Sequence, residues 1–551
     1  MKFTSSLICL VITIFAYFNA HAQEKNGNMF DSAHVYYERK DFKRAAHFFD
    51  IYYIEQKKAQ SNYDTYFAAV AAAHVGNTER ATYYLQRSAL VGYDFEEYNF
   101  FANDPNNVPL RNLPQWKKFI SDFKYKSDSA KVIMDKTIAE INDTTIRAQS
   151  SLLNDKAYWT NAATKSTSEQ LIKKIKQFNA YLPTKKDNFW SLYQIKANDT
   201  LTVPFLVHVP KGYRPTEKTA LYIYLHGAII NRKNFTNPKY IPNGLEIPAM
   251  TKAMEQNAFI IYPLGKKDFG WLHQQQAFET ILKEIVYVKS HYNIDDNKIY
   301  VGGHSNGGSG AFWFALNQPS IFASFFGFNY LPKTYYGNTS LRNLNNKTFY
   351  GISGSDDSSF PLTLVNPIYQ YGVSHGANWK NYVKKGGHSL PFSQRDSINF
   401  IFDTLATNIR NPFPKRLEWE TDNVKNGRNG WLEIMELDTL AEKASWQTTL
   451  NPTATQNGKT GIIDFNKNKS GAVKAYVEGN TIHIESSRVK RVKLYISEDM
   501  FDLKRQIKLI INGKDYINTK IAPDKSVILE EFLKTKDRDF IVSNIIEFTI
   551  T

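Results

Sequence analysis

A single serine at the end of a short β-forming stretch constrains this chain of 551 residues more than any other feature. The stretch 298–302 is rich in apolar β-formers and leads into Gly303-His304-Ser305-Asn306-Gly307, followed by the small residues 307–311. Glycines flank the turn because a Cβ there would collide with the strand or the helix. The sequence therefore predicts a strand, a tight turn with Ser305 at its apex and a helix. The alternative is a glycine-rich loop that only packs a helix on a strand.

A serine raised above a sheet in this way is typical of a nucleophile, which needs a histidine base, a carboxylate to orient it and N–H donors for an oxyanion. Downstream, 348–353 predicts a strand that is followed by Asp356 and Asp357. The spacing of Asp357, three residues after Gly354 and four before Pro361, favours it as the acid, with Asp356 as the alternative. The other aspartate is expected to be solvated or to cap a helix.

The expected base is His388. The stretch 378–383 predicts the last strand of the sheet, and a Gly-Gly-His-Ser turn follows it before a helix near 397–407. The chain has 12 histidines, so the glycine pair and the strand support the assignment more than the histidine itself does. His375 is the alternative, although it falls in a connection between a helix and a strand.

Upstream, 221–225 predicts a buried strand that ends at His226-Gly227-Ala228. The backbone N–H groups of Ala228 and Asn306 are the expected oxyanion donors. His226 is expected to shape this loop rather than to take part in the chemistry. Two loops, 235–247 and 266–276, are expected to wall the substrate pocket. The residues expected to line that pocket are His226, Gly227, Trp271 and His304.

These motifs together resemble the esterase branch of the α/β-hydrolase superfamily, and secreted polyhydroxybutyrate-depolymerase-like and feruloyl-esterase-like enzymes in particular. The resemblance spans about 203–406 and rests on Leu225-His226-Gly227, 293–300, 303–308, the Asp357 loop and Gly387-His388. It implies a charge-neutral ester or amide as substrate, a covalent acyl-enzyme, and no metal or organic cofactor. Prolyl-oligopeptidase-like peptidases share much of this pattern, so the resemblance indicates the reaction class better than the substrate.

The leading hypothesis is an exported serine hydrolase that cleaves carboxylic esters, such as acyl groups on polysaccharides. A serine peptidase of the prolyl-oligopeptidase kind is the first alternative, although such peptidases usually carry a β-propeller or gating domain before the hydrolase. A binding protein on a non-catalytic hydrolase scaffold is the second. The intact set of Ser305, Asp357 and His388 argues against that second alternative.

The first 22 residues predict a secretory signal peptide. Lys2 precedes an apolar core at 7–18, and Ala20-His21-Ala22 is a suitable cleavage site. The core is too short for a stable membrane span and no second such run follows, so we expect a soluble exported protein, periplasmic or extracellular. The sole cysteine, Cys9, lies in this segment, and a mature chain without disulfides favours a bacterial origin.

The formal net charge is +15, and its lysines and arginines are spread along the chain. A solvated basic surface is the favoured interpretation, with attraction to anionic glycans or membrane headgroups as the alternative. Nucleic acid is not an expected partner, because no binding module for it is recognisable.

The chain as a whole predicts a multidomain protein. Residues 23–126 predict a helical domain, in which 36–45 and 72–81 resemble tetratricopeptide repeats, and this domain is expected either to bind a protein partner or to cap the catalytic domain. A helical connector, 127–192, leads to an α/β-hydrolase domain at 193–410 with a mostly parallel sheet. Alternating strands and Asn-Gly-type turns in 411–551 predict an all-β sandwich, either a carbohydrate-binding module or a structural partner.

Overall fold

A computed structural model describes residues 29–55, 62–88, 95–228, 234–235, 248–272, 274–390, 395–456 and 458–550. The predicted signal peptide with Cys9, and 236–247 of the predicted pocket wall, lie outside these residues. Among the helices that the structure describes, none has the length and apolar character needed to cross a bilayer. The chain divides into two compact units, Met1–Ala139 and Glu140–Thr551.

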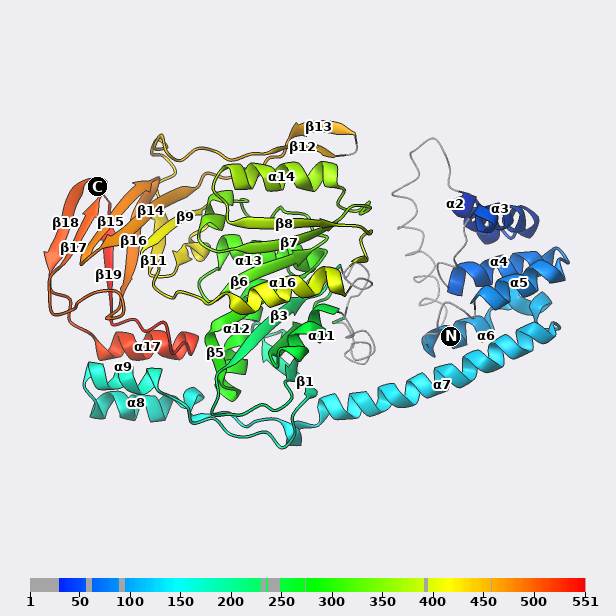
Figure 1. The fold of residues 1–551 in the computed structure, drawn as a ribbon, viewed down its shortest axis with the longest axis horizontal. Coiled ribbons are helices and arrows are strands. Elements are labelled where there is room, and N and C mark those ends of the chain that lie inside the picture. The colour runs from blue at the N-terminus through cyan, green and yellow to red at the C-terminus, as the bar shows by residue number, and fades with distance from the viewer. Residues whose placement is uncertain are drawn as a thin grey trace. The chain divides into compact units, whose positions relative to one another are not determined.

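The first unit is helical, as the sequence predicts. Its helices pack pairwise through alanines and aromatic rings, and their shared core contains Ala45, Phe49, Ala81 and Tyr84. Short turns at Lys40-Asp41 and Gly76-Asn77 separate the members of the first two pairs. The assignment to tetratricopeptide repeats stays a prediction. The helices are α2 (Met29–Glu38), α3 (Phe42–Glu55), α4 (Asn62–His74), α5 (Thr78–Ser88), α6 (Phe95–Asn103), η1 (Pro105–Leu110) and α7 (Pro114–Asn142), which ends in the second unit (Figure 1).

The second unit is built on an eight-stranded sheet with the order β1-β2-β4-β3-β5-β6-β7-β8. Only β2 runs antiparallel to the others, so the predicted mostly parallel sheet is confirmed, and the strand order is that of the α/β-hydrolase fold. The predicted domain start at 193 falls inside the first strand. The strands are β1 (Phe189–Lys196), β2 (Thr202–Val209), β3 (Thr219–Leu225), β4 (Phe259–Pro263), β5 (Ile294–His304), β6 (Ser324–Phe328), β7 (Phe349–Gly354) and β8 (Trp379–Lys384).

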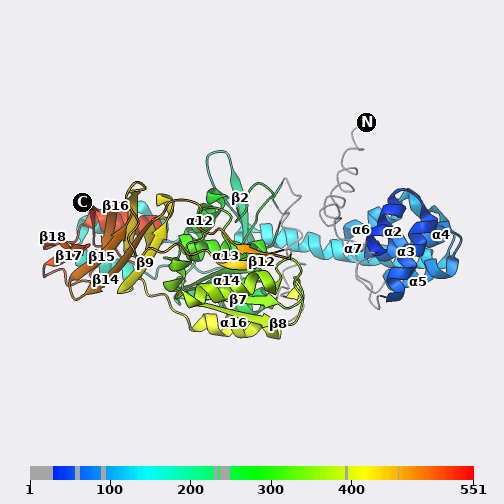
Figure 2. The same cartoon turned by 90° about the horizontal axis from the view of Figure 1, so that it is seen from above.

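Helices cover both faces of this sheet (Figure 1 and Figure 2). Side chains alternate between the faces along each strand, as Ile223 and Tyr222 do on β3. On the Ile223 side lie α12 (Gln275–His291), α13 (Asn306–Asn317) and α14 (Leu362–Ser374). On the Tyr222 side lie α11 (Pro248–Glu255) and α16 (Asp396–Thr407). Because all strands except β2 are parallel, their carboxyl ends lie at one edge of the sheet. Ligand sites of α/β folds form at this edge.

The last part of the chain forms two sheets that share a core containing Trp419, Ile434, Val473 and Leu494. The five-stranded sheet has the order β18-β17-β15-β14-β9 and the four-stranded sheet β10-β11-β16-β19. The strands are β9 (Arg416–Thr421), β10 (Arg428–Asn429), β11 (Leu432–Leu437), β14 (Gly471–Glu478), β15 (Thr481–Ser487), β16 (Val489–Ile496), β17 (Ile507–Ile511), β18 (Lys514–Thr519) and β19 (Asn544–Thr549), with η6 (Val424–Asn426) after β9.

A helix in this segment, α17 (Lys525–Thr535), departs from the all-β prediction. Its apolar residues Ile528 and Phe532 pack against Trp159 and Leu171 of the predicted connector. The connector is thus a packing partner of the C-terminal segment, through α8 (Lys156–Lys165) and α9 (Ser168–Lys176), which follow η2 (Thr144–Ile146) and η3 (Leu152–Asn154).

The C-terminal segment also contributes to the core of the eight-stranded sheet. The hairpin of β12 (Thr453–Gln456) and β13 (Lys459–Ile462) lies on α14, and Leu450, Ala454 and Phe465 join that core. Buried ion pairs add to this contact: Arg410 Nη1 and Nη2 lie 2.6 and 2.9 Å from the Asp537 carboxylate oxygens. A short helix, η5 (Leu341–Asn345), provides Arg342, which pairs with Glu418 at 2.7 Å and with Glu420 at 3.1 Å.

Candidate active site

Ser305 stands at a strained turn between β5 and α13, with φ 55° and ψ −121°. Positive φ is unfavourable for a residue with a Cβ, so the surrounding structure must hold this conformation. Both flanking glycines are required: a Cβ on Gly303 or Gly307 would lie 2.1 or 1.9 Å from the carbonyl oxygen of Leu225. The Ser305 N–H donates to the Phe328 carbonyl oxygen at 3.0 Å and ties the turn to β6. The sequence prediction of strand, turn and helix is confirmed.

Three side chains from three connections form one line of hydrogen bonds. His388 Nε2 lies 3.1 Å from Ser305 Oγ, and His388 Nδ1 lies 2.9 and 3.1 Å from the two oxygens of Asp357. A carboxylate accepts only, so Nδ1 carries the proton and Nε2 is left to accept the proton of Ser305. This is the orientation that a general base needs.

Asp357 is held as a carboxylate. Its side chain is 1% exposed, and burial alone would raise its pKa. Hydrogen bonds from His388 and from the Phe360 and Ser359 amides, at 3.1 and 2.8 Å, outweigh burial and place the pKa of Asp357 below its ordinary value. Asp356 is exposed and accepts a hydrogen bond from Ser355 Oγ at 3.1 Å, so it is not the partner of the histidine.

The alternative base, His375, does not lie in this arrangement. It is exposed at the C-terminal end of α14, and its Nδ1 lies 2.8 Å from the Tyr371 carbonyl oxygen of the same helix.

Of the two predicted oxyanion donors, one directly follows Ser305 and the other directly follows Gly227 in the loop after β3. Asn306 is the first residue of α13, and the first N–H groups of a helix have no acceptor within the helix. Ala228 is exposed and is the last described residue of the loop after β3. Their role as donors stays a prediction.

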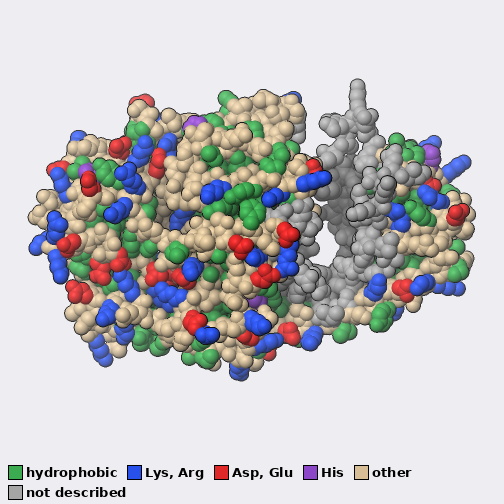
Figure 3. All heavy atoms as spheres, in the orientation of Figure 1, with side chains coloured by type: hydrophobic (Ala, Val, Ile, Leu, Met, Phe, Trp, Pro, Cys, Tyr) green, Lys and Arg blue, Asp and Glu red, His purple; other side chains and the backbone are tan. Residues whose placement is uncertain are grey.

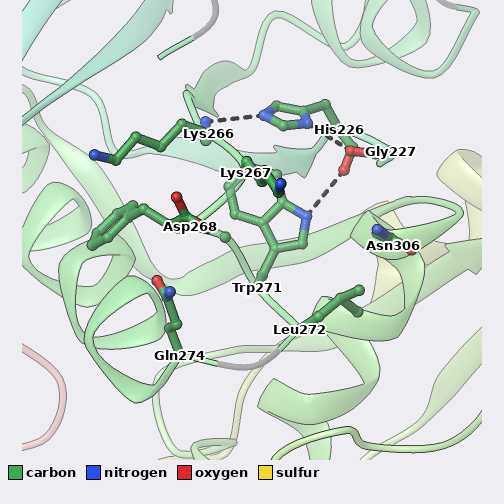
Figure 4. A pocket seen from close by; sticks show the side chains of 12 residues that line it. His226, Gly227, Lys266, Lys267, Asp268, Trp271, Leu272, Gln274 and Asn306 are labelled. Atoms are coloured by element: carbon green, nitrogen blue, oxygen red, sulfur yellow. Dashed lines mark hydrogen bonds between the residues drawn. The ribbon is translucent and has the colours of Figure 1, made fainter. Parts of the chain in front are cut away.

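His226 fixes the loop after β3. Its Nε2 accepts the Gly265 N–H at 3.0 Å, so its proton is on Nδ1, which donates to the Gly227 carbonyl oxygen at 2.8 Å. Trp271 Nε1 donates to the His226 carbonyl oxygen at 3.0 Å (Figure 4). The imidazole therefore connects the loops after β3 and β4, which is the structural role that the sequence favoured.

A cavity of about 250 Å³ lies beside Ser305. Of the predicted pocket residues, His226, Gly227 and Trp271 line it, together with Asn306 and the connection from Gly265 to Gln274 (Figure 4). A Cβ on Gly227 would lie 3.5 Å from the Cβ of Ser305, which places this wall against the serine.

His304 was also expected in the pocket, but it is buried beside His388 instead. Its Nε2 lies 2.8 Å from the His388 carbonyl oxygen, and the two rings are 4.7 Å apart. Burial lowers the pKa of His304 to about 4, so the ring is neutral at ordinary pH and its Nε2–H can donate. The direction of this side chain depends on the His388 loop, which lies 84 positions downstream, so the sequence pattern does not reveal it.

Asn329, directly after β6, was not identified from the sequence. Its side chain donates to the Gly387 carbonyl oxygen at 2.7 Å and accepts the Gly354 N–H at 3.1 Å. It thus ties the loop of the acid to the loop of the base. A polar residue immediately after the apolar stretch 324–328 was the only sequence signal. Within the described residues, no group of three or more His, Cys, Asp or Glu side chains is placed to hold a metal ion.

A family model described as "Putative esterase" matches residues 201–331, which include Ser305 and end before Asp357 and His388. This match supports a hydrolase. A search of curated proteins found no match.

Among solved structures, a thermostable esterase is 18% identical, with a TM-score of 0.34, and the match covers 40% of this chain and 63% of that one. An S-formylglutathione hydrolase from Agrobacterium tumefaciens is 17% identical, with a TM-score of 0.32, covering 41% of this chain and 98% of that one. An acylaminoacyl peptidase from Pyrococcus horikoshii is 16% identical, with a TM-score of 0.33, and the match covers 42% of this chain and 44% of that one.

Proposed function

We propose that this protein is a serine hydrolase that cleaves carboxylic esters. The observation that carries the proposal is the line of hydrogen bonds from Ser305 through His388 to Asp357, at 3.1 and 2.9 Å, on a strained turn beside a cavity. An adjacent base of this kind is what converts a weak hydroxyl nucleophile into an effective one.

The reaction follows from these positions. His388 Nε2 takes the proton of Ser305 as Oγ bonds to the ester carbonyl carbon, and the Asn306 and Ala228 N–H groups stabilise the oxyanion. The tetrahedral species collapses, the C–O bond to the alcohol breaks, and His388 returns the proton to the alcohol. Water then attacks the acyl-enzyme with His388 as base, and the carboxylic acid leaves with Ser305 restored. Asp357 holds the imidazole orientation and stabilises its charged form throughout.

The proposal includes export through the predicted signal peptide at 1–22, to the periplasm or beyond. It also includes polysaccharide-linked acyl groups as substrates and a protein partner for the helical unit. Export would bring the enzyme to polysaccharides outside the cytoplasm. A mature chain without disulfides is compatible with either the periplasm or the cell exterior.

The test is labelling of the purified protein by a fluorophosphonate probe, which reacts only with an activated serine. We expect the wild type to label and Ser305→Ala to lose labelling, with kcat reduced on the order of a million-fold. Adjacent aspartates provide a matched control: Asp357→Asn should reduce kcat about 10⁴-fold because the imidazole adopts the wrong tautomer, whereas Asp356→Asn should stay within about twofold.

A panel of acyl esters and peptides then separates the ester hydrolase from the peptidase by their kcat/KM values. A folded wild type that never labels would overturn the proposal.

A further inference from the structure

A second pocket, of about 350 Å³, is lined by three segments of the second unit. The connection after β6 provides Leu331 and Tyr335, and α14 provides Leu364. The third segment belongs to the C-terminal part of the chain and runs from Gln456, at the end of β12, to Lys467. The hairpin of β12 and β13 lies on α14 (Figure 1). The catalytic sheet and the C-terminal segment therefore form this pocket together.

Two of the lining segments are joined to the catalytic residues. Ser309, one turn after Ser305 on α13, donates from Oγ to the Leu331 carbonyl oxygen at 3.0 Å. Phe360 lies two residues before α14, and its ring centroid is 5.5 Å from that of His388. The pocket therefore borders the site of the proposed reaction.

Hydrogen bonds tie the C-terminal segment to the connection after β6. The Thr339 N–H donates to the Phe465 carbonyl oxygen at 2.8 Å. The Asn338 side chain donates to the Asn468 carbonyl oxygen at 2.8 Å and accepts the Asn468 N–H at 3.0 Å. These bonds hold the two segments together before any ligand binds.

The aliphatic side chains of the pocket are already used in packing, because Leu364 and Ile368 are buried. Tyr335 differs from them, since it is 45% exposed. A tyrosine offers the apolar face of its ring together with a hydroxyl that both donates and accepts. A pocket for an aliphatic acyl chain would instead present mainly apolar groups.

The charged groups of the pocket are of both signs. Lys333 and Lys467 line it together with Asp464. Burial lowers the pKa of Lys333, the charge of Lys467 lowers this pKa further, and the Asp464 carboxylate raises it, so both groups act on the same ammonium. On the face drawn in Figure 3, lysines and arginines likewise lie among aspartates and glutamates. The pocket thus offers donors and acceptors together rather than a site for one sign of charge.

We propose that this pocket binds a sugar unit of a glycan whose acyl group is cleaved at Ser305, with the Tyr335 ring packed on the sugar ring. The inference rests on the proposed function and makes it more specific: the C-terminal segment takes part in recognition of the substrate. Sugar hydroxyls both donate and accept hydrogen bonds, as does the amide of Gln456, and ammonium and carboxylate groups complement them. The C–H face of a sugar ring is apolar and can pack on an aromatic ring.

Acetyl esters of sugars test this, in three series built on glucose, xylose and mannose, each with a monosaccharide and a tetrasaccharide. We expect the tetrasaccharide ester to have the higher kcat/KM by about three- to tenfold in at least one series, because its further sugar units can occupy the pocket. Tyr335→Ala should bring that ratio close to one and leave the hydrolysis of 4-nitrophenyl acetate unchanged. Lys467→Ala, at an exposed position of the C-terminal segment, should lower the same ratio.

Tyr476→Ala is the matched control. Tyr476 is 38% exposed, belongs to the C-terminal segment and stacks on His483 at 4.4 Å, and it is not among the described residues that line the pocket. This variant should leave the ratio and the hydrolysis of 4-nitrophenyl acetate unchanged.

Three results would overturn the sugar site while 4-nitrophenyl acetate is still cleaved in a Ser305-dependent manner. They are equal kcat/KM values within every series, no cleavage of any sugar ester, and a ratio that Tyr335→Ala leaves unaltered. Absence of all ester cleavage and of probe labelling would instead overturn the proposed function.

Discussion

Two side chains outside the line of Ser305, His388 and Asp357 hold the loops of the site together. Asn329 has φ 44°, a conformation that asparagine tolerates better than most residues with a Cβ. It is 1% exposed, and its one amide group joins a carbonyl of the His388 loop to an N–H of the Asp357 loop. His304 supports the same loop through the next carbonyl, that of His388. These two residues are positioning residues, since both act on the backbone that presents the imidazole.

Replacing Asn329 by Leu should therefore reduce kcat about 10- to 100-fold with a smaller change in KM, because displacement of a catalytic group by about 1 Å has effects of this size. Asn343→Leu is the matched control: Asn343 is equally buried at 1% and donates to the carbonyl oxygens of Leu316 and Glu420 at 2.7 and 2.8 Å, away from the site. Both variants should lose about 1–3 kcal/mol of stability in a denaturant titration. Equal kcat values for the two folded variants would contradict a positioning role for Asn329.

At the scale of elements, the strand–turn–helix around Ser305 was predictable because its requirements are local. The glycines, the β-forming stretch and the small residues lie within 15 positions of the chain, and the two glycines that flank the turn, Gly303 and Gly307, meet the same steric constraint from Leu225. The spacing favoured Asp357 over Asp356, and the structure adds the physical reason, which is burial with hydrogen bonds from Ser359, Phe360 and His388. Asn329 escaped prediction because its partners lie 25 and 58 positions downstream and meet only in the folded sheet. Helix α17 escaped because its apolar partners belong to α8 and α9.

The strained turn between β5 and α13 gives a prediction for Gly307→Ala. The added Cβ would lie 1.9 Å from the Leu225 carbonyl oxygen, a contact that only movement of the turn or of β3 can relieve. We expect a loss of at least about 1–3 kcal/mol in stability together with loss of fluorophosphonate labelling. Gly461→Ala is the control, since a Cβ there meets nothing within 4 Å, and it should change neither property. Full labelling of Gly307→Ala would show that the close approach is not required.

At the scale of the second unit, charges buried between the eight-stranded sheet and the C-terminal segment join the two. The side chains of Arg410 and Asp537 are 1% and 3% exposed. Arg538 Nε lies 3.1 Å from Asp296 Oδ2, and these two side chains are 1% and 0% exposed. Removing one member of such a pair leaves the other uncompensated in the interior, which costs several kcal/mol. The C-terminal segment is therefore joined to the eight-stranded sheet by buried ion pairs as well as by apolar contacts.

Lys347 lies in the same region and makes the stability of this region pH-dependent. Its ammonium donates to the Phe322 carbonyl oxygen. Burial, followed by the nearby charge of Arg410, lowers the pKa of Lys347 from 10.5 to about 7. Between these values the unfolded chain binds a proton that the folded chain does not, so this lysine makes stability rise with pH from about 7 to about 10.

Measurement of the free energy of unfolding of the wild type and of Lys347→Met at several pH values in this range checks the point. The free energy of unfolding of the wild type should rise relative to that of the variant as pH rises, by at most about 1.4 kcal/mol per pH unit, because the variant has no proton to lose at this position. The exposed Lys425 provides the control, and Lys425→Met should follow the wild type in parallel across the range. Parallel curves for the wild type and Lys347→Met would mean that the lysine keeps its proton in the folded protein, with the Asp537 carboxylate compensating its burial.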